Sequence, residues 1–102
     1  MNATSSSQDA LLAKIADRSA RLCVIGMGYV GLPLAIEFGR AGFAVTGIDL
    51  DEAKCASLNA GRSYVGDVPA AAVAEMVQAG RLSATGDYGV VGEADVAIVC
   101  VP

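Results

Sequence analysis

The sequence of 102 residues contains no histidine, few basic residues and no long hydrophobic run. Without histidine, the chain lacks the side chain that most often acts as a general base in catalysis. Its seven lysines and arginines are scattered and form no basic stripe, which argues against a nucleic-acid partner. The apolar runs reach about six residues, which suits a strand and is too short to span a membrane. We therefore expect no nucleic-acid partner, no membrane segment and no catalytic apparatus in this chain.

Cysteine is also scarce, and Cys23, Cys55 and Cys100 are widely spaced. Their spacing matches neither a zinc-binding pattern nor a Cys-x-x-Cys redox motif, so we predict no metal site. An odd number of separated cysteines, behind an N-terminus without the basic segment of a signal peptide, is typical of the reducing cytoplasm. Cys23 and Cys100 lie in apolar segments and are interpreted as core residues. Cys55 has only Lys54 as a basic neighbour, which argues against a nucleophilic role.

What the sequence does contain is a globular composition. Hydrophobic residues make up 54% of the chain, 12 residues are glycines, and the formal net charge is −4. The length suits one domain with a modest core. We predict a leader and a short helix over residues 1–20, of which residues 1–7 are disordered, and a single domain over residues 21–102.

Strand-like and helical patterns alternate through this domain. Continuous apolar runs predict buried strands at residues 21–25 and 95–101, and residues 43–48 and 81–85 are interpreted as the second strand and a short third strand. Helical patterns lie between them, at residues 29–41, 51–59 and 69–80, with one further helical turn at residues 87–92. The alternation predicts an α/β fold with a parallel sheet and right-handed crossovers. We expect the strand order 3-2-1-4, with helices on both faces. Since the chain stops directly after the fourth strand, we interpret it as a truncated, N-terminal part of a larger protein.

A glycine-rich turn joins the first strand to the first helix of the domain. Gly26, Gly28 and Gly31 form the pattern Gly-x-Gly-x-x-Gly directly after the buried strand. Gly26 permits the tight turn, Gly28 lets a pyrophosphate approach the backbone, and Gly31 lets the helix pack close to the sheet. The free N–H groups and the positive dipole end of the helix stabilise the phosphates. The pattern predicts a dinucleotide-binding Rossmann fold, although the same glycines also suit a tight turn that binds nothing.

Asp49 stands at the end of the second strand, 18 residues beyond Gly31. A carboxylate in this position accepts hydrogen bonds from the adenosine ribose and repels the 2′-phosphate of NADP, so we predict NAD as the cofactor. Two nearby side chains have alternative interpretations. Lys54 either reaches the ribose region or is solvated on a surface helix, and Tyr29 either lines the cofactor cleft or packs on the neighbouring helix.

Residues 24–35 read Val-Ile-Gly-Met-Gly-Tyr-Val-Gly-Leu-Pro-Leu-Ala, and the run Gly-Tyr-Val-Gly-Leu-Pro within them is far more specific than the glycine pattern. This stretch resembles the start of the UDP-glucose/GDP-mannose dehydrogenase family. The segments Lys14–Arg18 and Asn59–Tyr64 are similar to the branch that acts on UDP-N-acetylhexosamines. Cys100–Pro102 resembles the family's Val-Pro-Thr-Pro loop, and the resemblance covers nearly all of residues 11–102.

The resemblance implies an enzyme that oxidises the C6 hydroxymethyl group of a nucleotide sugar to a carboxylate and reduces two NAD molecules. It suggests synthesis of surface polysaccharide precursors, and we expect a cytoplasmic homo-oligomer in the full-length form. The family's cysteine nucleophile, with an assisting lysine and asparagine, belongs to later segments and is not transferred to the cysteines of this chain. By resemblance, the cofactor contacts are Gly26, Gly28, Tyr29, Val30, Gly31, Asp49 and Lys54, with Val101 and Pro102 near the nicotinamide end.

Three functions are compatible with these observations. The leading hypothesis is the NAD-binding portion of a UDP-sugar 6-dehydrogenase, whose substrate, a UDP-N-acetylhexosamine, binds through a missing C-terminal domain. The alternatives are another NAD-dependent dehydrogenase of the β-hydroxyacid type and a non-catalytic dinucleotide-binding module. A later cysteine flanked by glycines distinguishes the first function from the second, which uses a catalytic lysine or histidine.

Overall fold

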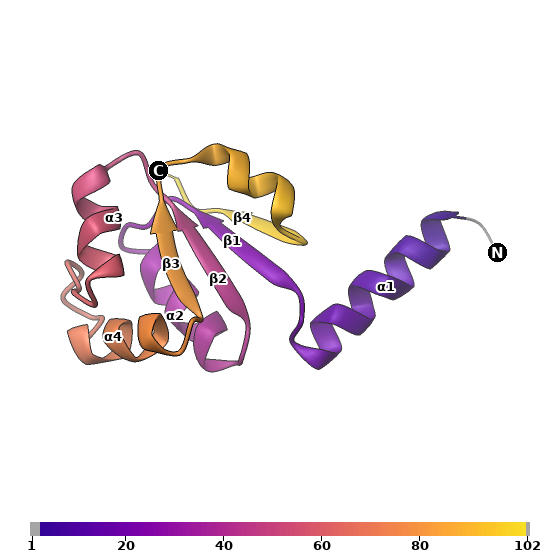
Figure 1. The fold of residues 1–102 in the computed structure, drawn as a ribbon, viewed down its shortest axis with the longest axis horizontal. Helices are drawn as coiled ribbons and strands as arrows, with labels where there is room; N and C mark the ends of the chain where they lie inside the picture. Colours follow the sequence, from indigo (N-terminus) through magenta and orange to yellow (C-terminus); the bar gives the residue numbers. More distant parts are fainter. Residues whose placement is uncertain (1–2, 102) are drawn as a thin grey trace.

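The central sheet has four parallel strands, whose order in space differs from their order in the chain (Figure 1). The computed structural model describes residues 3–101 and places β1 at Arg21–Ile25, β2 at Ala44–Ile48, β3 at Leu82–Thr85 and β4 at Val96–Val99. The order across the sheet is β3-β2-β1-β4, which confirms the predicted arrangement. Ile25 pairs with Ile48 on one side and with Val99 on the other, so the carboxyl ends of these strands lie at one edge.

Three α-helices cover one face of the sheet. They are α2 at Gly31–Arg40, α3 at Glu52–Asn59 and α4 at Ala70–Gln78. α2 packs mainly on β2, while α3 and α4 pack on β3 and lie together beside it (Figure 1). The 3-10 helix η1, Tyr88–Glu93, connects β3 to β4 and borders a hollow on the opposite face together with Cys23 and Thr46. The prediction of helices on both faces is confirmed, with only this short helix on the second face within residues 3–101.

The helix α1, Ala3–Asp17, extends away from the rest of the molecule (Figure 1). The prediction of disorder is therefore wrong for residues 3–7, where no glycine or proline interrupts the helix; residues 1–2 lie outside the described part. Polar contacts join α1 to the sheet. Lys14 Nζ lies 3.1 Å from a carboxylate oxygen of Asp95, whose other oxygen accepts from the Arg21 N–H at 2.8 Å.

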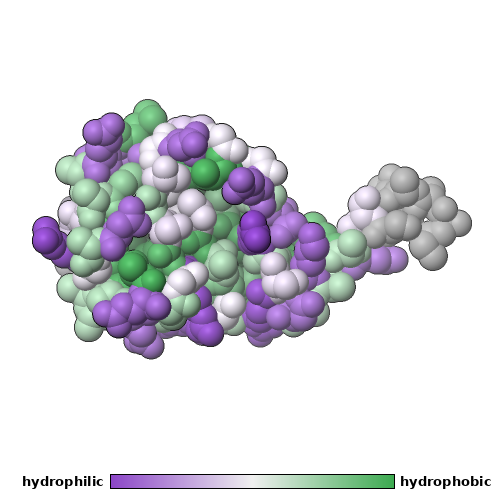
Figure 2. All heavy atoms as spheres, viewed as in Figure 1, coloured by the Kyte–Doolittle hydropathy of each residue, from purple (hydrophilic) through white to green (hydrophobic). Residues whose placement is uncertain are grey.

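Figure 2 shows hydrophilic side chains distributed over this side of the molecule, with hydrophobic ones exposed between them. Among residues 3–101, no helix combines the length and the apolar character that crossing a membrane requires. Three predicted boundaries need correction by two residues each, and one of them is the end of α4, which lies at Gln78 because Gly80 follows in a left-handed conformation. α2 begins later, at Gly31, because the preceding residues form the glycine turn, and β4 ends earlier because its neighbour β1 ends at Ile25 and offers no further strand partner.

Local interactions set where two helices begin and end. Asp51 caps α3, because its carboxylate accepts from the N–H of Ala53 at 3.0 Å and from the N–H of Lys54 at 3.3 Å. Gly42 follows α2 with a φ of +104°, a left-handed conformation that glycine adopts without strain.

The side chain of Asn59, the last residue of α3, is bound to the edge strand β3. Its amide nitrogen donates to the Ala84 carbonyl at 2.8 Å, and its amide oxygen accepts from the Ala84 N–H at 2.9 Å. This pair of bonds fixes the end of α3 against the sheet.

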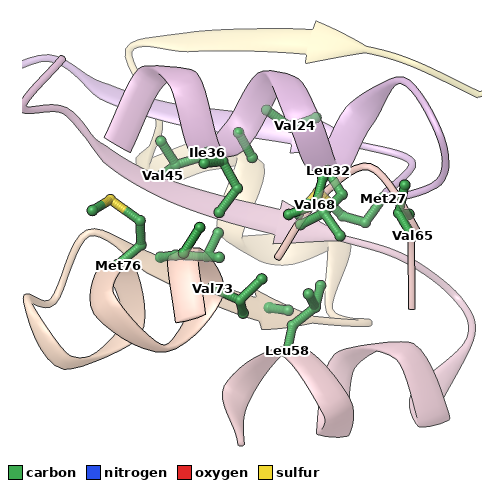
Figure 3. Close-up of a cluster of buried hydrophobic side chains, with 14 of the residues drawn as sticks. Val24, Met27, Leu32, Ile36, Val45, Leu58, Val65, Val68, Val73 and Met76 are labelled. Carbon is green, nitrogen blue, oxygen red and sulfur yellow. The ribbon is translucent and has the colours of Figure 1, made fainter. Parts of the chain in front are cut away.

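The core lies between the sheet and the helices α2, α3 and α4. Alternate strand residues face these helices, among them Val24 of β1 and Val45 of β2. Leu32 and Ile36, one turn apart on α2, and Val73 of α4 meet them from the other side (Figure 3). Each such side chain, once buried, contributes about 1.5–3 kcal/mol. This packing fixes the position of α2 and of the glycine turn relative to the carboxyl edge of the sheet.

Candidate functional site

The glycine turn between β1 and α2 has no room for a side chain at two positions. Gly26 has a φ of +94°, and a Cβ there would lie 3.0 Å from the carbonyl group of Cys100. A Cβ at Gly31 would lie 1.7 Å from the carbonyl oxygen of Gly26. Gly26 therefore permits the turn and the close approach of the chain after β4, and Gly31 permits α2 to pack on the turn.

Gly28 differs from these two glycines because a Cβ there would meet nothing within 4 Å. The helix that follows has Val30 at its N-cap, which provides no side-chain hydrogen bond. Within residues 3–101, no group accepts from the N–H groups of Gly28, Tyr29, Val30 or Gly31. Free donors at the positive end of a helix dipole form a binding edge for an anion.

Asp49 follows β2 and lies beside the turn. One carboxylate oxygen accepts from the Met27 N–H at 3.0 Å, and the other accepts from the Asp51 N–H at 2.9 Å. Burial raises the pKa of Asp49, but these two N–H donors and the charge of Lys54 outweigh it, so the pKa lies below its ordinary value. Asp49 is thus ionised at neutral pH, and each oxygen keeps a lone pair that can accept from a hydroxyl group.

A pocket of about 610 Å³ opens at this carboxyl edge of the sheet. It is lined by Gly26, Gly28, Tyr29, Val30, Ile48, Asp49, Leu50, Lys54, Tyr88, Cys100 and Val101. Several of these side chains are large, apolar and exposed, with exposed fractions of 83% for Tyr29, 76% for Leu50 and 46% for Tyr88. Exposed apolar groups around a polar turn are typical of a site that a ligand or another part of a protein covers.

The structure brings seven of the nine residues of the predicted cofactor set to this pocket. Gly31 lies behind the turn, where its close contact with Gly26 gives it a packing role. Pro102 lies outside the described residues. The exposed Tyr29 lines the pocket, which agrees with the cleft alternative for this residue. Lys54 is half-buried and also lines the pocket.

Five residues of the site were not in the predicted cofactor set, and two of them are Ile48, at the end of β2, and Cys100, directly after β4. Leu50 and Tyr88 line the outer part of the pocket, and Tyr64 donates its hydroxyl hydrogen to the carbonyl oxygen of Met27. Leu50 had a usable signal, since an apolar residue directly after Asp49 is unusual in a polar loop. Tyr64 lies in the loop between α3 and α4 and Tyr88 is the first residue of η1, and no local pattern indicates that these distant segments return to the turn.

The three cysteines are free thiols, with Cys23 and Cys55 buried and Cys100 half-buried. Burial raises the pKa of Cys23. Burial, followed by the charge of Asp49, also raises the pKa of Cys55, whose thiol donates to the Asp49 carbonyl at 3.4 Å. A neutral, buried thiol is a poor nucleophile, in agreement with a packing role for Cys23 and Cys55. Cys100 packs against the core and lines the pocket.

Open parallel sheets bind ligands beyond their carboxyl ends, at the point where the strand order reverses. In this sheet the reversal falls between β1 and β4, next to the glycine turn. The fold and the pocket therefore define a Rossmann domain for a dinucleotide. Residues 20–102 match the UDP-glucose/GDP-mannose dehydrogenase family, NAD binding domain, and the chain belongs to this family. NAD is the cofactor of this domain.

Individual relatives agree with this assignment. The chain is 38% identical over 85 residues to the UDP-N-acetyl-D-glucosamine 6-dehydrogenase of Pseudomonas aeruginosa, which covers 83% of this chain and 19% of the relative. It is 36% identical over 81 residues to a UDP-glucose 6-dehydrogenase of Haloferax volcanii, and the match covers 79% of this chain and 19% of that protein. A solved ternary complex of GDP-mannose dehydrogenase from Pseudomonas aeruginosa matches with a TM-score of 0.76 and 34% identity, and the match covers 80% of this chain and 19% of that one. The chain thus spans about a fifth of the length of these proteins.

Proposed function

We propose that this chain is the NAD-binding part of a nucleotide-sugar 6-dehydrogenase. The reaction oxidises the C6 hydroxymethyl group of a UDP-sugar, with addition of one water, to a carboxylate, and it reduces two NAD. Family membership and relatives named as UDP-sugar dehydrogenases support this proposal. A UDP-N-acetylhexosamine is the substrate class we favour, because the segment Asn59–Tyr64 is similar to that branch of the family.

The row of free N–H groups at the start of α2 is the observation that carries the proposal. The N–H groups of Gly28, Tyr29 and Val30 belong to residues that line the pocket and have no acceptor within residues 3–101. They fit the diphosphate of NAD, whose oxygens are strong acceptors. The open space over Gly28 admits this group close to the backbone.

The carboxylate of Asp49 fits the adenosine ribose. It is ionised, and its two oxygens have lone pairs left for the 2′- and 3′-hydroxyls. The 2′-phosphate of NADP would instead place negative charge beside this carboxylate. Lys54, which also lines the pocket, offsets part of that repulsion without removing the carboxylate, so NAD is preferred.

The nicotinamide end of NAD falls on the other side of the turn. Gly26 lies against Cys100, and Val101 lines the pocket next to it. We therefore place the nicotinamide near Val101, where bound NAD would supply the hydride acceptor. The role of this chain is to bind and orient the cofactor, and we assign it no catalytic residue.

The full-length protein that contains this chain tests the proposal. It is incubated with NAD and, in turn, UDP-N-acetylglucosamine, UDP-N-acetylmannosamine, UDP-glucose and GDP-mannose, while NADH is followed by absorbance and the sugar product by mass spectrometry. We expect two NADH for each sugar carboxylate formed from a UDP-sugar. Absence of reduction with every nucleotide sugar contradicts the proposal, and reduction with a β-hydroxyacid favours the alternative enzyme class.

A further inference from the structure

Tyr64 lies between α3 and α4 and contacts the glycine turn from outside it. Its hydroxyl donates a hydrogen bond to the carbonyl oxygen of Met27, the residue between Gly26 and Gly28. The hydrogen bonds of α2 start one residue later, where the Leu32 N–H donates to the Gly28 carbonyl at 3.1 Å. The Met27 carbonyl therefore lies outside the helix, and Tyr64 provides its hydrogen-bond partner.

The loop that carries Tyr64 is itself held in place. Val65 and Val68 are buried and belong to the same apolar cluster as Met27 (Figure 3). The Ser63 hydroxyl donates to the Val65 carbonyl at 3.0 Å and accepts from the Val65 N–H at 3.3 Å. These contacts hold the loop in place whether or not Tyr64 bonds to the turn. Forming the Tyr64 hydrogen bond therefore costs little additional conformational entropy.

Met27 is fixed at each of its groups. Its N–H donates to Asp49 at 3.0 Å, and its carbonyl accepts from Tyr64. Its side chain is fully buried over Gly47, where a Cβ would lie 2.6 Å from Met27 Cε. Because the peptide unit is planar and trans, the Met27 carbonyl and the Gly28 N–H point in opposite directions. Holding the carbonyl on Tyr64 therefore also sets the direction of the Gly28 N–H.

The ring of Tyr64 makes a second contact. Lys54 Nζ lies 5.5 Å from the ring centroid, within the range of a cation–π interaction. Lys54 lines the cofactor pocket and helps to lower the pKa of Asp49. Tyr64, Lys54 and Gly28 also line an adjoining hollow of about 370 Å³. The ring thus keeps the ammonium group at the side of the pocket where Asp49 stands.

We propose that Tyr64 is a positioning residue for NAD: its hydroxyl orients the Gly28 N–H toward the diphosphate, and its ring holds Lys54 beside the adenosine ribose. The inference rests on the cofactor site of the proposed function and is independent of the sugar substrate. Burial, followed by the charge of Asp49, raises the pKa of Tyr64 far above its ordinary value, so the hydroxyl keeps its hydrogen and remains a donor at neutral pH.

Tyr64→Phe in the full-length protein removes the hydroxyl and keeps the ring. We expect the Kd for NAD, measured by calorimetry with NAD alone, to rise about three- to tenfold, the effect of one hydrogen bond. The KM for NAD rises equally, while kcat at saturating NAD is unchanged because bound diphosphate itself orients the turn. Thr46→Val, which removes a hydroxyl on the opposite face of the sheet, is the matched control and leaves the Kd unchanged.

Tyr64→Leu removes the ring as well and tests its contact with Lys54. We expect a larger rise in Kd than with Tyr64→Phe, and we expect the additional rise to vanish when both variants also carry Lys54→Met. An unchanged Kd in Tyr64→Phe, even with a lowered Tm, overturns the role of the hydroxyl. An additional rise that persists with Lys54→Met overturns the role of the ring. Calorimetry needs no sugar, so these results stand even if no nucleotide sugar is oxidised.

Discussion

The cofactor pocket has two walls of different construction. The inner wall, formed by Gly26–Gly28 and Asp49, is fixed by close backbone contacts, by the buried Met27 side chain and by hydrogen bonds from both sides. The outer wall consists of exposed apolar side chains: Tyr29, Val30, Leu50, Tyr88 and Val101. The inner wall is organised before a ligand arrives, whereas the outer wall gains burial only when a ligand or another part of the protein covers it.

The difference shows which part of the pocket supplies which part of the affinity. The inner wall offers donors and a carboxylate in fixed directions, so it selects the diphosphate and the ribose. The outer wall offers apolar contacts, which have no preferred direction. It therefore strengthens the binding of a flat base but discriminates little between different bases. Substitutions in the inner wall should therefore change stability, selectivity or the access of the diphosphate to the backbone, whereas substitutions in the outer wall should cause only modest changes in affinity.

Gly31→Ala is expected to have the largest effect on the inner wall. Its new Cβ would lie 1.7 Å from the Gly26 carbonyl oxygen, so the turn and α2 must separate. We expect a loss of about 3 kcal/mol of unfolding free energy, which lowers the Tm by roughly 10–20 °C. Thermal denaturation followed by circular dichroism measures this.

Gly28→Ala is the matched control within the same motif. A Cβ at Gly28 meets nothing within 4 Å, so the Tm should stay within a few degrees of the wild-type value, while the added methyl group blocks the diphosphate and raises the Kd for NAD at least about tenfold. Equal loss of stability in the two variants would show that the glycines act only in packing.

Asp49→Ala is expected to have the next largest effect, because the carboxylate serves both the turn and the ligand. Loss of a charge-assisted hydrogen bond to the ribose weakens NAD binding by about 1.5–3 kcal/mol. The bonds to the N–H groups of Met27 and Asp51 are lost as well, so the Tm also falls. Calorimetry with NAD and with NADP measures the affinity, and we expect the preference for NAD to shrink.

The stability that Asp49 provides should also depend on pH. Its pKa in the folded protein is lowered, so its contribution is complete above the unfolded pKa, about 3.9, and is lost as the pH falls through the folded pKa. Asp49→Asn has no proton to gain at this position. The difference in unfolding free energy between the wild type and Asp49→Asn should therefore narrow below about pH 4; a constant difference would mean that the charge does not stabilise the fold.

Leu50→Ser is expected to have the smallest effect and tests the outer wall. Leu50 is 76% exposed, so its replacement should leave the unfolding free energy within about 0.5 kcal/mol of the wild-type value. The Kd for NAD should rise about fivefold, through lost apolar contact with the adenine. Leu12→Ser on α1, another exposed leucine away from the pocket, is the control and should leave the Kd unchanged.

The sequence was informative where a single residue type satisfies a strict local constraint. Gly26 and Gly31 could be predicted because a positive φ or a close backbone excludes a Cβ, and Asp49 because an acid at the end of a strand has a known partner. The parallel sheet followed from the alternation of elements, and its strand order is the one expected for a Rossmann-type fold. The contact of Tyr64 with Met27 depends on how α3 and α4 pack against the sheet, which no local pattern records.

The side-chain amide of Asn59 has a consequence for how the sheet can grow. It occupies the outward N–H and carbonyl of Ala84, as the backbone of a neighbouring strand would. An extended peptide that approached β3 would have to displace this amide before it could pair with the edge. Within residues 3–101, no side chain is bound in this way to the other edge strand, β4. Strand addition is thus directed to β4, so the domain has one closed border and one that is open to extension.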